Sequence, residues 1–262
     1  MPLPIENLDK LAKKLMLSLQ DYSLFCWQTI SNVGRAPHYW GDVMTQADLI
    51  GVGSLPIVVL TGFFTGAVLA LQSAASLAQF GAQAYTGQFV SLSMIRELAP
   101  VLTGLMVSGR NASGMASELG SMVVTEQIDA MRALGTDPMK KLVTPRVLST
   151  VIMLFLLTIV SDTVGTAGGA AVAVLISKQN GTQYFTSAYH ALVYADIAQG
   201  LTKPLFFGFI ISTVGCYFGM KTTGGTQGVG RATTQAVVVS SVLIIFSDFI
   251  LSRAMLWLYS GI

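Results

Sequence analysis

Residues 49–71 of the chain read LIGVGSLPIVVLTGFFTGAVLAL, a segment without a charged side chain. The charge-free region is longer still, because no Asp, Glu, Lys or Arg occurs between Asp48 and Arg96. A globular protein could hardly draw part of its surface from such a sequence, whereas a helix needs roughly 20 apolar residues to cross a bilayer core. The region therefore predicts a membrane-spanning helix, a short loop and the start of a second spanning helix.

The composition of the whole chain agrees with a membrane location. Hydrophobic residues make up 52% of the 262 residues and charged residues only 11%, against about 25% charged residues in a typical soluble domain. The net charge of +2 is small and the basic residues form no stripe, so we expect no nucleic-acid partner. Cys26 and Cys216 give no disulfide framework or metal spacing, and His38 and His190 have no metal ligands at useful spacing.

Five apolar segments are long enough to be spanning helices, at about 49–71, 89–108, 147–176, 197–218 and 235–257. Small residues four apart let membrane helices approach closely, and they recur in three of these segments as Gly62 with Gly66, Gly165 with Gly169, and Gly215 with Gly219. No linker or low-complexity tail interrupts the chain. We therefore expect an all-α integral membrane protein, with residues 1–262 as one membrane domain and a five-helix bundle at about 49–258.

The segment at about 5–30 is amphipathic rather than uniformly apolar. At helical spacing, one face collects Leu8, Leu11, Leu15, Leu19, Tyr22 and Cys26, and the other collects Lys10, Lys13, Lys14 and Asp21. A basic amphipathic helix of this kind typically lies in the membrane interface. The alternative is a helix that docks on a partner protein.

The loops between the expected spans alternate in charge. The connection from Arg110 to Arg146 is rich in Lys and Arg, and residues 219–234 contain Lys221 and Arg231. The other two loops are nearly free of bases, with Lys178 alone in one of them. Because basic loops stay in the cytoplasm, we predict a cytoplasmic N-terminus and a C-terminus on the outer side.

The basic connection contains a predicted short helix at 125–134. Thr125 can act as its N-cap, Glu126 and Asp129 suit its positive end, and Gly135 followed by Pro138 would end it. An apolar stripe on this helix consists of Ile128, Met131 and Leu134. It is either a plain surface connector or a coupling helix that docks in a groove of a cytoplasmic ATPase.

Charged residues inside membrane helices are costly and usually face a partner or a cavity. The candidates are Arg96, Glu97, Asp162, Lys203 and Asp248. They form either structural pairs, such as Lys203 with Asp248 or Glu97, or a polar lining for a lipid headgroup, and the two roles can coexist. We predict that four of them, all except Asp162, form one cluster in the outer half of the bundle. Candidate lining residues of an acyl-chain pocket are Leu69, Leu71, Phe89 and Met94; the alternative for each is ordinary helix packing or lipid contact.

Several long motifs resemble the MlaE (YrbE) permease family. They are RELAPVLTGLMVSGR at 96–110, ASELGSMVVTEQIDAMRALG at 116–135, LVTPR at 142–146 and GVGRATTQAVV at 228–238. The resemblance covers about residues 45–258, and the central motif is highly specific. Two mild departures are Ala99, where many members have Gly, and Ser108, where Ala is usual.

The resemblance implies a permease subunit of an ABC transporter that moves phospholipid between the inner and outer bacterial membranes. Family members work as pairs bound to two ATPase subunits, often with a STAS-domain regulator, below a ring of MCE-domain proteins on the outer side. Relatives handle sterols or phosphatidic acid. The chain would then be a multi-pass inner-membrane protein. Its coupling segment would lie near 118–138 and include Glu118, Glu126, Ile128, Asp129, Met131 and Arg132.

No enzymatic motif accompanies this pattern. The glycine-rich run at 224–234 lacks the Gly-Lys-Ser/Thr ending of a phosphate loop and leads into an apolar span, so we interpret it as a flexible cytoplasmic turn. The chain should not hydrolyse ATP, and ATP and Mg²⁺ would bind a partner. Two alternatives are an ion-coupled secondary transporter that uses the buried carboxylates, which would require internal repeats, and a non-transporting scaffold for an ATPase.

Overall fold

The computed structural model describes residues 5–35, 37 and 39–259, and every regular element among them is helical. Side chains are described at residue 13 and from residue 16 onward, apart from positions 36, 38 and 259–262. The predicted apolar positions Leu8, Leu11 and Leu15 and the bases Lys10 and Lys14 therefore lie outside the described side chains. His38 lies outside the described residues.

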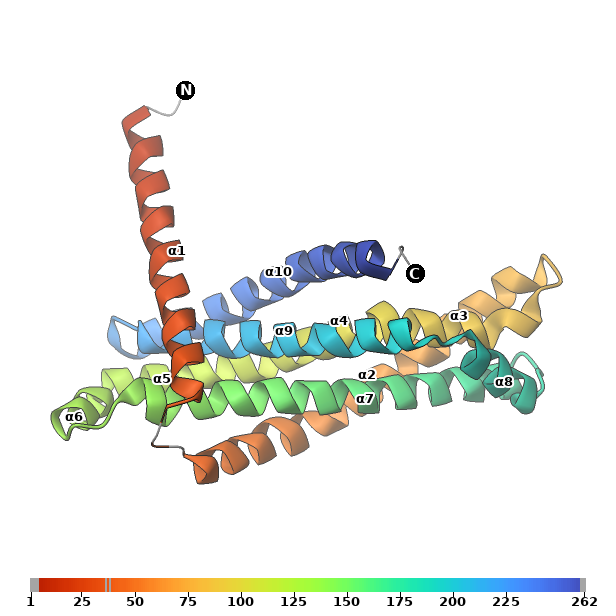
Figure 1. Cartoon of the computed structure of the whole chain (residues 1–262), viewed down its shortest axis with the longest axis horizontal. Coiled ribbons are helices and arrows are strands. Elements are labelled where there is room, and N and C mark those ends of the chain that lie inside the picture. The colour runs from red at the N-terminus through yellow and green to blue at the C-terminus, as the bar shows by residue number, and fades with distance from the viewer. Residues whose placement is uncertain (1–4, 36, 38, 260–262) are drawn as a thin grey trace.

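Within the described residues, five helical stretches are long and apolar enough to cross a membrane, as the sequence predicts. They are α2 (Trp40–Ala78), a composite span (Gln83–Val124), a third span (Met139–Leu175), α9 (Tyr194–Met220) and α10 (Gly225–Tyr259). The spans lie side by side along the long axis of the molecule, and α10 leans away from the others (Figure 1). The expected all-α membrane fold is confirmed.

The composite span is a chain of short helical pieces. It runs through η1 (Gln83–Tyr85), α3 (Thr86–Ser93), η2 (Met94–Leu98), α4 (Ala99–Val107), η3 (Ser108–Ala112) and α5 (Ser113–Val124). Both η2 and η3 are π-helical, as is η4 (Met139–Val143), which opens the third span before α7 (Thr144–Leu175). Such widened turns are rare and frequently occur at functional sites. Hydrophobic periodicity does not reveal them.

The paired glycines bring helix backbones together. A Cβ on Gly66 of α2 would overlap the backbone of Gly165 in α7, and a Cβ on Gly168 of α7 would overlap the backbone of Phe63. Gly215 and Gly219 place α9 close to η3 and α5, with Ala112 the nearest residue to Gly215 and Leu119 the nearest to Gly219. The close packing that the small-residue spacing predicts is therefore present at two helix crossings.

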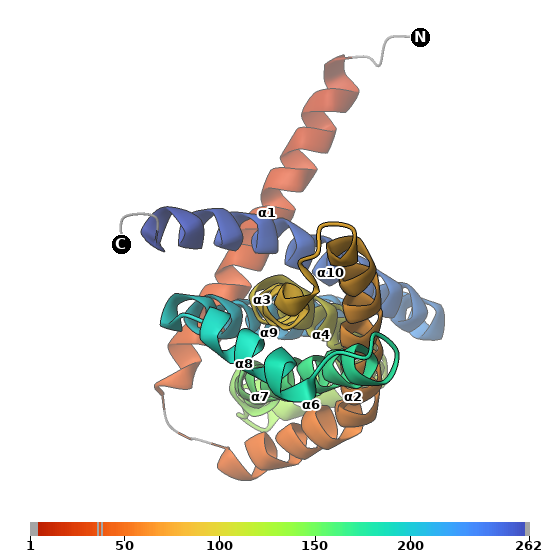
Figure 2. The ribbon, with the colours of Figure 1, turned by 90° about the vertical axis from the view of Figure 1, so that its right-hand side faces the viewer.

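The first helix, α1 (Ile5–Val33), stands across the direction of the spans (Figures 1 and 2). Its second half docks on α9, where Tyr22 and Phe25 make edge-to-face contacts with Tyr217. Thr213 already donates to Phe209, so the Tyr22 hydroxyl is the donor in its 2.8 Å bond to Thr213. Burial raises the pKa of Tyr22 and keeps that donor protonated.

Two local predictions are wrong in detail. Thr125 does not cap the short helix; it ends α5, and its hydroxyl donates to the Ser121 carbonyl. Glu126, in a left-handed conformation, instead precedes α6 (Gln127–Ala133). The glycine-rich run is not a turn throughout, because α10 begins at Gly225. The predicted left-handed Gly135 is present.

A helix that the sequence does not announce, α8 (Gly181–Ala191), lies at the opposite end of the molecule from α6 (Figure 1). Asn180 caps it by accepting a hydrogen bond from the Thr182 backbone, and it packs on α3, where Ser91 donates to the Ala188 carbonyl. Its fully buried Tyr184 joins the core between α3 and α7.

Candidate functional site

Lys203 is the centre of a polar cluster inside the bundle. Its side chain is 0% exposed, and Nζ lies 2.5 Å from Glu97 Oε2, 2.9 Å from Asp248 Oδ1 and 2.8 Å from the carbonyl oxygen of Arg96. These groups come from α9, η2 and α10. Three oxygen atoms therefore surround the three-proton ammonium group, which compensates for much of the cost of burying a charge.

The local sequence explains why the Arg96 carbonyl is available. In an α-helix that oxygen would accept from the backbone four residues later, but this residue is Pro100, which has no N–H. The π-helical η2 begins six residues before this proline and ends two residues before it. Lys203 donates to the carbonyl that proline leaves without its usual donor, so the cluster satisfies a backbone group as well as two carboxylates.

Glu97 also has partners that sequence reasoning missed. Its Oε1 accepts from Ser252 at 3.0 Å and from Gln199 at 3.4 Å. The Glu97 side chain is 43% exposed, unlike Lys203. Glu97 is thus the member of the cluster that connects the buried Lys203 to an open space beside it.

Arg96 pairs with Asp196, which was not among the candidates. Arg96 Nε donates to Asp196 Oδ1 at 2.8 Å, and the other carboxylate oxygen of Asp196 accepts from the Val193 backbone at the start of α9. The group therefore contains two bases and three acids, rather than the two and two expected. Asp196 lies in the first turn of α9, where an acidic residue is common because it stabilises the positive end of the helix. Its partner is 100 residues away, so no local pattern reveals the pair.

Asp162 stands apart from this cluster. It lies on α7 and is 9% exposed, and its Oδ1 has no hydrogen-bond partner among the described residues. Its isolation agrees with the prediction that only four of the five charged candidates come together.

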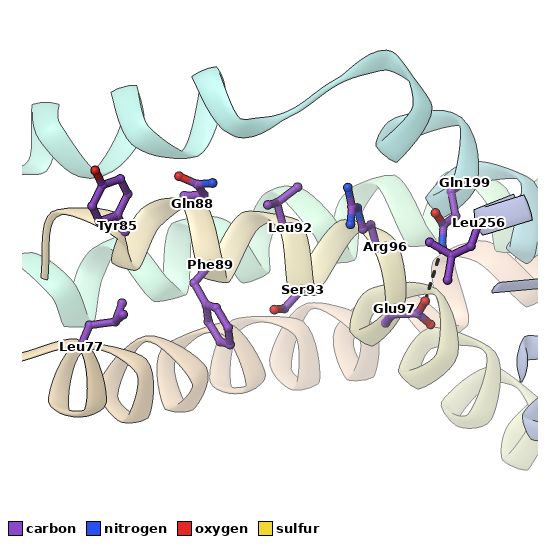
Figure 3. A pocket seen from close by; sticks show the side chains of 10 residues that line it. All are labelled: Leu77, Tyr85, Gln88, Phe89, Leu92, Ser93, Arg96, Glu97, Gln199 and Leu256. Carbon is purple, nitrogen blue, oxygen red and sulfur yellow. Dashed lines mark hydrogen bonds between the residues drawn. The ribbon is translucent and has the colours of Figure 1, made fainter. Parts of the chain in front are cut away.

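An open cavity of about 610 Å³ lies directly beside the cluster. Its wall consists of Leu77, Tyr85, Gln88, Phe89, Leu92, Ser93, Arg96, Glu97, Gln199 and Leu256. Figure 3 shows Arg96, Glu97 and Gln199 together at one end of this wall, and Leu77 and Phe89 towards the other. The cavity therefore has its charged groups at one end, while apolar and uncharged polar side chains line the rest.

Of the four candidate acyl-chain residues, Phe89 alone belongs to this wall. Met94 is fully buried, and its terminal methyl group fills the space beside Gly165 of α7. Leu69 packs on the core, and Leu71 is exposed on α2. Helical position separates these residues, because the cavity wall includes Tyr85 of η1 and the face of α3 that carries positions 88, 89 and 92.

The candidate coupling residues lie at the opposite end, where their surroundings differ. Asp129 and Arg132 of α6 are exposed and form an ion pair at 3.0 Å, and Glu126 is also exposed. Ile128 is 2% exposed and faces the bundle, and Met131 is half-buried, whereas Leu134 projects at 84% exposure. Glu118 is not on α6 but on α5, where it pairs with Arg146 at 2.8 Å. The predicted stripe is therefore divided, with Ile128 turned inward.

Comparison with known proteins gives a consistent result. The family described as Permease MlaE matches residues 43–254. A probable ABC transporter permease protein of Rickettsia felis is 45% identical over 92% of this chain and 93% of its own length. One from Synechocystis is 42% identical over 82% and 81%. The chloroplast protein Trigalactosyldiacylglycerol 1 of Arabidopsis thaliana is 37% identical over 86% of this chain and 64% of its own. The chain belongs to the MlaE permease family and is the non-catalytic transmembrane subunit of an ABC transporter.

Proposed function

We propose that this permease moves phospholipid between the inner and outer membranes of a bacterium and resides in the inner membrane. The observation that carries the proposal is the amphipathic cavity beside the Lys203 cluster. Its volume of about 610 Å³ falls in the range of roughly 300–1,000 Å³ of ligand pockets. Charged groups at one end, and a wall along the rest that mixes Leu77, Phe89 and Leu92 with uncharged polar groups, suit a molecule with a polar head and an acyl chain. One relative bears the name of a glycolipid.

The charges at the cavity favour a headgroup that carries both signs. Arg96 and Glu97 both line the wall and both keep about two-fifths of their side chains exposed. A lipid phosphate can accept from the Arg96 guanidinium, and an ammonium group can donate to Glu97. Lys203 is fully enclosed by the protein and is not available to a ligand. Its role in this proposal is to hold Glu97 in place.

Membership of an ABC family means that a separate ATPase supplies the energy, and it argues against the ion-coupled alternative. In our proposal the ATPase binds ATP and Mg²⁺, and this chain binds no cofactor. The exposed side chains of α6, Asp129, Arg132 and Leu134, dock in its groove. A second copy of the permease, an MCE-domain ring on the outer side and a STAS-domain regulator complete the assembly.

A bulky substitution in the cavity tests the transport role. Leu92→Trp should fill part of the cavity while leaving the charged cluster intact. Leu60→Trp is the matched control, because Leu60 projects 59% exposed from α2. With the permease and its ATPase in proteoliposomes, Leu92→Trp should reduce lipid transfer and lipid-stimulated ATP hydrolysis at least tenfold relative to Leu60→Trp. Equal transfer by the two variants would exclude this cavity as the route. Normal ATPase binding with no transfer in the wild type would favour the scaffold alternative.

A further inference from the structure

A second pocket lies on the other π-helical segment of the same span. The segment η3 carries Arg110 and Asn111, and both line an open cavity of about 300 Å³ between α2 and α5. The remaining wall includes Leu49, Ile50, Met115 and Glu118. No residue is shared with the wall of the transport cavity.

The two pockets lie at different membrane depths. Arg96 and Arg110 are fourteen positions apart in one nearly continuous helix, which is about 20 Å at a rise of 1.5 Å per residue. The hydrocarbon core of a bilayer is about 30 Å thick. Leu49, in the wall of the second pocket, is also the first residue after Asp48 in the charge-free stretch. The second pocket therefore lies near the headgroup boundary, in the leaflet on the α6 side.

Arg110 is held in this pocket by α2. Its NH1 group donates to the Leu49 carbonyl and to Ser54 Oγ, both at 3.0 Å. The guanidinium lies so close to Gly53 that any Cβ there would overlap it. Two acceptors on NH1 leave the donors on NH2 and Nε for a ligand, and a guanidinium presents five donors in a fixed fork. The missing side chain at position 53 therefore makes room for a fixed cation.

Asn111 supplies a second group that points to a ligand. It is 7% exposed, and its Nδ2 has no hydrogen-bond partner among the described residues. A buried amide donor without an acceptor is costly. Asn111 lines the pocket, and rotation of its side chain would bring this donor to a ligand oxygen there.

The surrounding charges leave the pocket positive. Glu118 is the acid in the wall, and the buried Arg146 guanidinium pairs with it at 2.8 Å. One acid and two bases, Arg110 and Arg146, give a local sum of +1. An anion with an apolar tail fits a pocket that combines this charge with Leu49, Ile50 and Met115.

We propose that this pocket binds an anionic phospholipid of the leaflet on the α6 side, with its phosphate on Arg110 and Asn111. The lipid lies outside the transport cavity and is retained through the transport cycle. Its site adjoins α5, the helix that leads directly to α6. The proposal concerns a separate site and does not depend on which lipid the transporter moves.

Native mass spectrometry of the delipidated permease–ATPase complex, titrated with phosphatidylglycerol or phosphatidylcholine, tests the site. The wild type should retain one tightly bound phosphatidylglycerol per permease that phosphatidylcholine does not replace. R110Q should weaken its retention roughly ten- to a hundredfold, as expected for the loss of a charge-assisted hydrogen bond. G53A should have a similar effect with every charge kept, because the new methyl group displaces the guanidinium.

Three controls make the result decisive. R231Q removes an exposed base of α10, and G230A adds a methyl group where no atom lies within 4 Å, so both should retain the lipid. Leu92→Trp, in the transport cavity, should also retain it, which separates this site from the transport route. If R110Q and R231Q lost phosphatidylglycerol to the same extent, general surface charge would explain the binding and the proposal would be overturned. Displacement by excess inorganic phosphate would show a free-anion site and overturn the lipid assignment.

Discussion

At the scale of single residues, the Lys203 ammonium is the group on which the other charges depend. It neutralises Glu97 and Asp248 together and also serves the Arg96 carbonyl. Both carboxylates retain some exposure, whereas Lys203 has none. Loss of the cation should therefore harm the protein more than loss of either acid, because it leaves two carboxylates uncompensated.

We expect Lys203→Met to lower the stability of the folded permease by about 3–5 kcal/mol, the cost of breaking a buried ion pair from one side. The triple variant K203M/E97Q/D248N removes the uncompensated charges and should lie closer to the wild type. Thermal unfolding in detergent, followed by size-exclusion chromatography, measures both. Lys13→Met, at an exposed position of α1, is the control. A triple variant less stable than Lys203→Met would show that the carboxylates do not depend on Lys203.

Sequence alone identifies the four charges of the cluster because each interrupts an apolar segment. It does not identify Asp196, Gln199 or Ser252, whose residue types are ordinary at helix starts and in membrane helices. Their contacts join segments 100 or more residues apart, and neither spacing nor periodicity records such distances. Three of the four acyl-chain candidates, all except Phe89, lie outside the cavity wall for a related reason, because hydrophobicity does not say whether a residue faces the core, lipid or a cavity.

At the scale of helices, the contact between α2 and α7 relies on the absence of side chains. Gly66→Ala should destabilise the bundle by about 1–3 kcal/mol, the usual cost of overpacking, since its methyl group would overlap the Gly165 backbone. Gly41→Ala in the same helix meets no atom within 4 Å and should be neutral or slightly stabilising. Thermal unfolding of both variants in detergent measures the difference. Equal stability of the two would contradict the close approach.

The short helix α6 should behave as a docking element. Asp129→Ala with Arg132→Ala removes its exposed ion pair and should leave membrane insertion unchanged while reducing ATPase co-purification at least fivefold. Thr182→Ala with Gln183→Ala on α8, at the other end of the molecule, is the matched control. Quantitative pull-down of the ATPase from solubilised membranes provides the measurement. Retention of wild-type ATPase binding and lipid-stimulated hydrolysis would rule out this docking site.

The ends of the helices are predicted less well from the sequence than their existence. Apolar length predicts all five spans, but α2 and α10 extend well beyond their apolar segments because helix formation continues into polar residues. Gly135 ends the region of α6 as expected. Thr125 fails as a cap because α5 continues to the residue before it, so its hydroxyl serves the preceding helix. The segment that becomes α8 is short and polar, and its stability comes from packing on α3.

At the scale of the whole molecule, the bases gather at one end. Arg110, Arg132, Lys140, Lys141, Arg146, Lys221 and Arg231 belong to the half that carries α6. By the positive-inside rule we expect this end to face the cytoplasm. The exposed apolar side chains of α1, such as Trp27 and Ile30, would then lie at the cytoplasmic face of the membrane.

Thiol labelling tests this orientation. In a background without Cys26 and Cys216, single cysteines at Ala84 in η1 and Ala133 in α6 occupy exposed positions at opposite ends. With no ATPase co-expressed, an impermeant maleimide applied to intact spheroplasts should label position 84 and spare position 133. Permeabilised spheroplasts should label both. The reverse pattern, with position 133 alone labelled in intact spheroplasts, would invert the topology.

The glycine contact between α2 and α7 has a mechanical consequence. Two helices in direct backbone contact cannot slide or separate without losing their whole interface. We therefore expect α2 and α7 to move together as one rigid unit. The opposite condition holds for α10, of whose most apolar 18 residues 17% are buried, against 33–56% in the other spans. Yet α10 supplies Asp248, Ser252 and the Leu256 wall of the cavity. In the proposed transport role, we expect α10 to move against α2 and α7, and the contact between Asp248 and Lys203 would have to break for that movement.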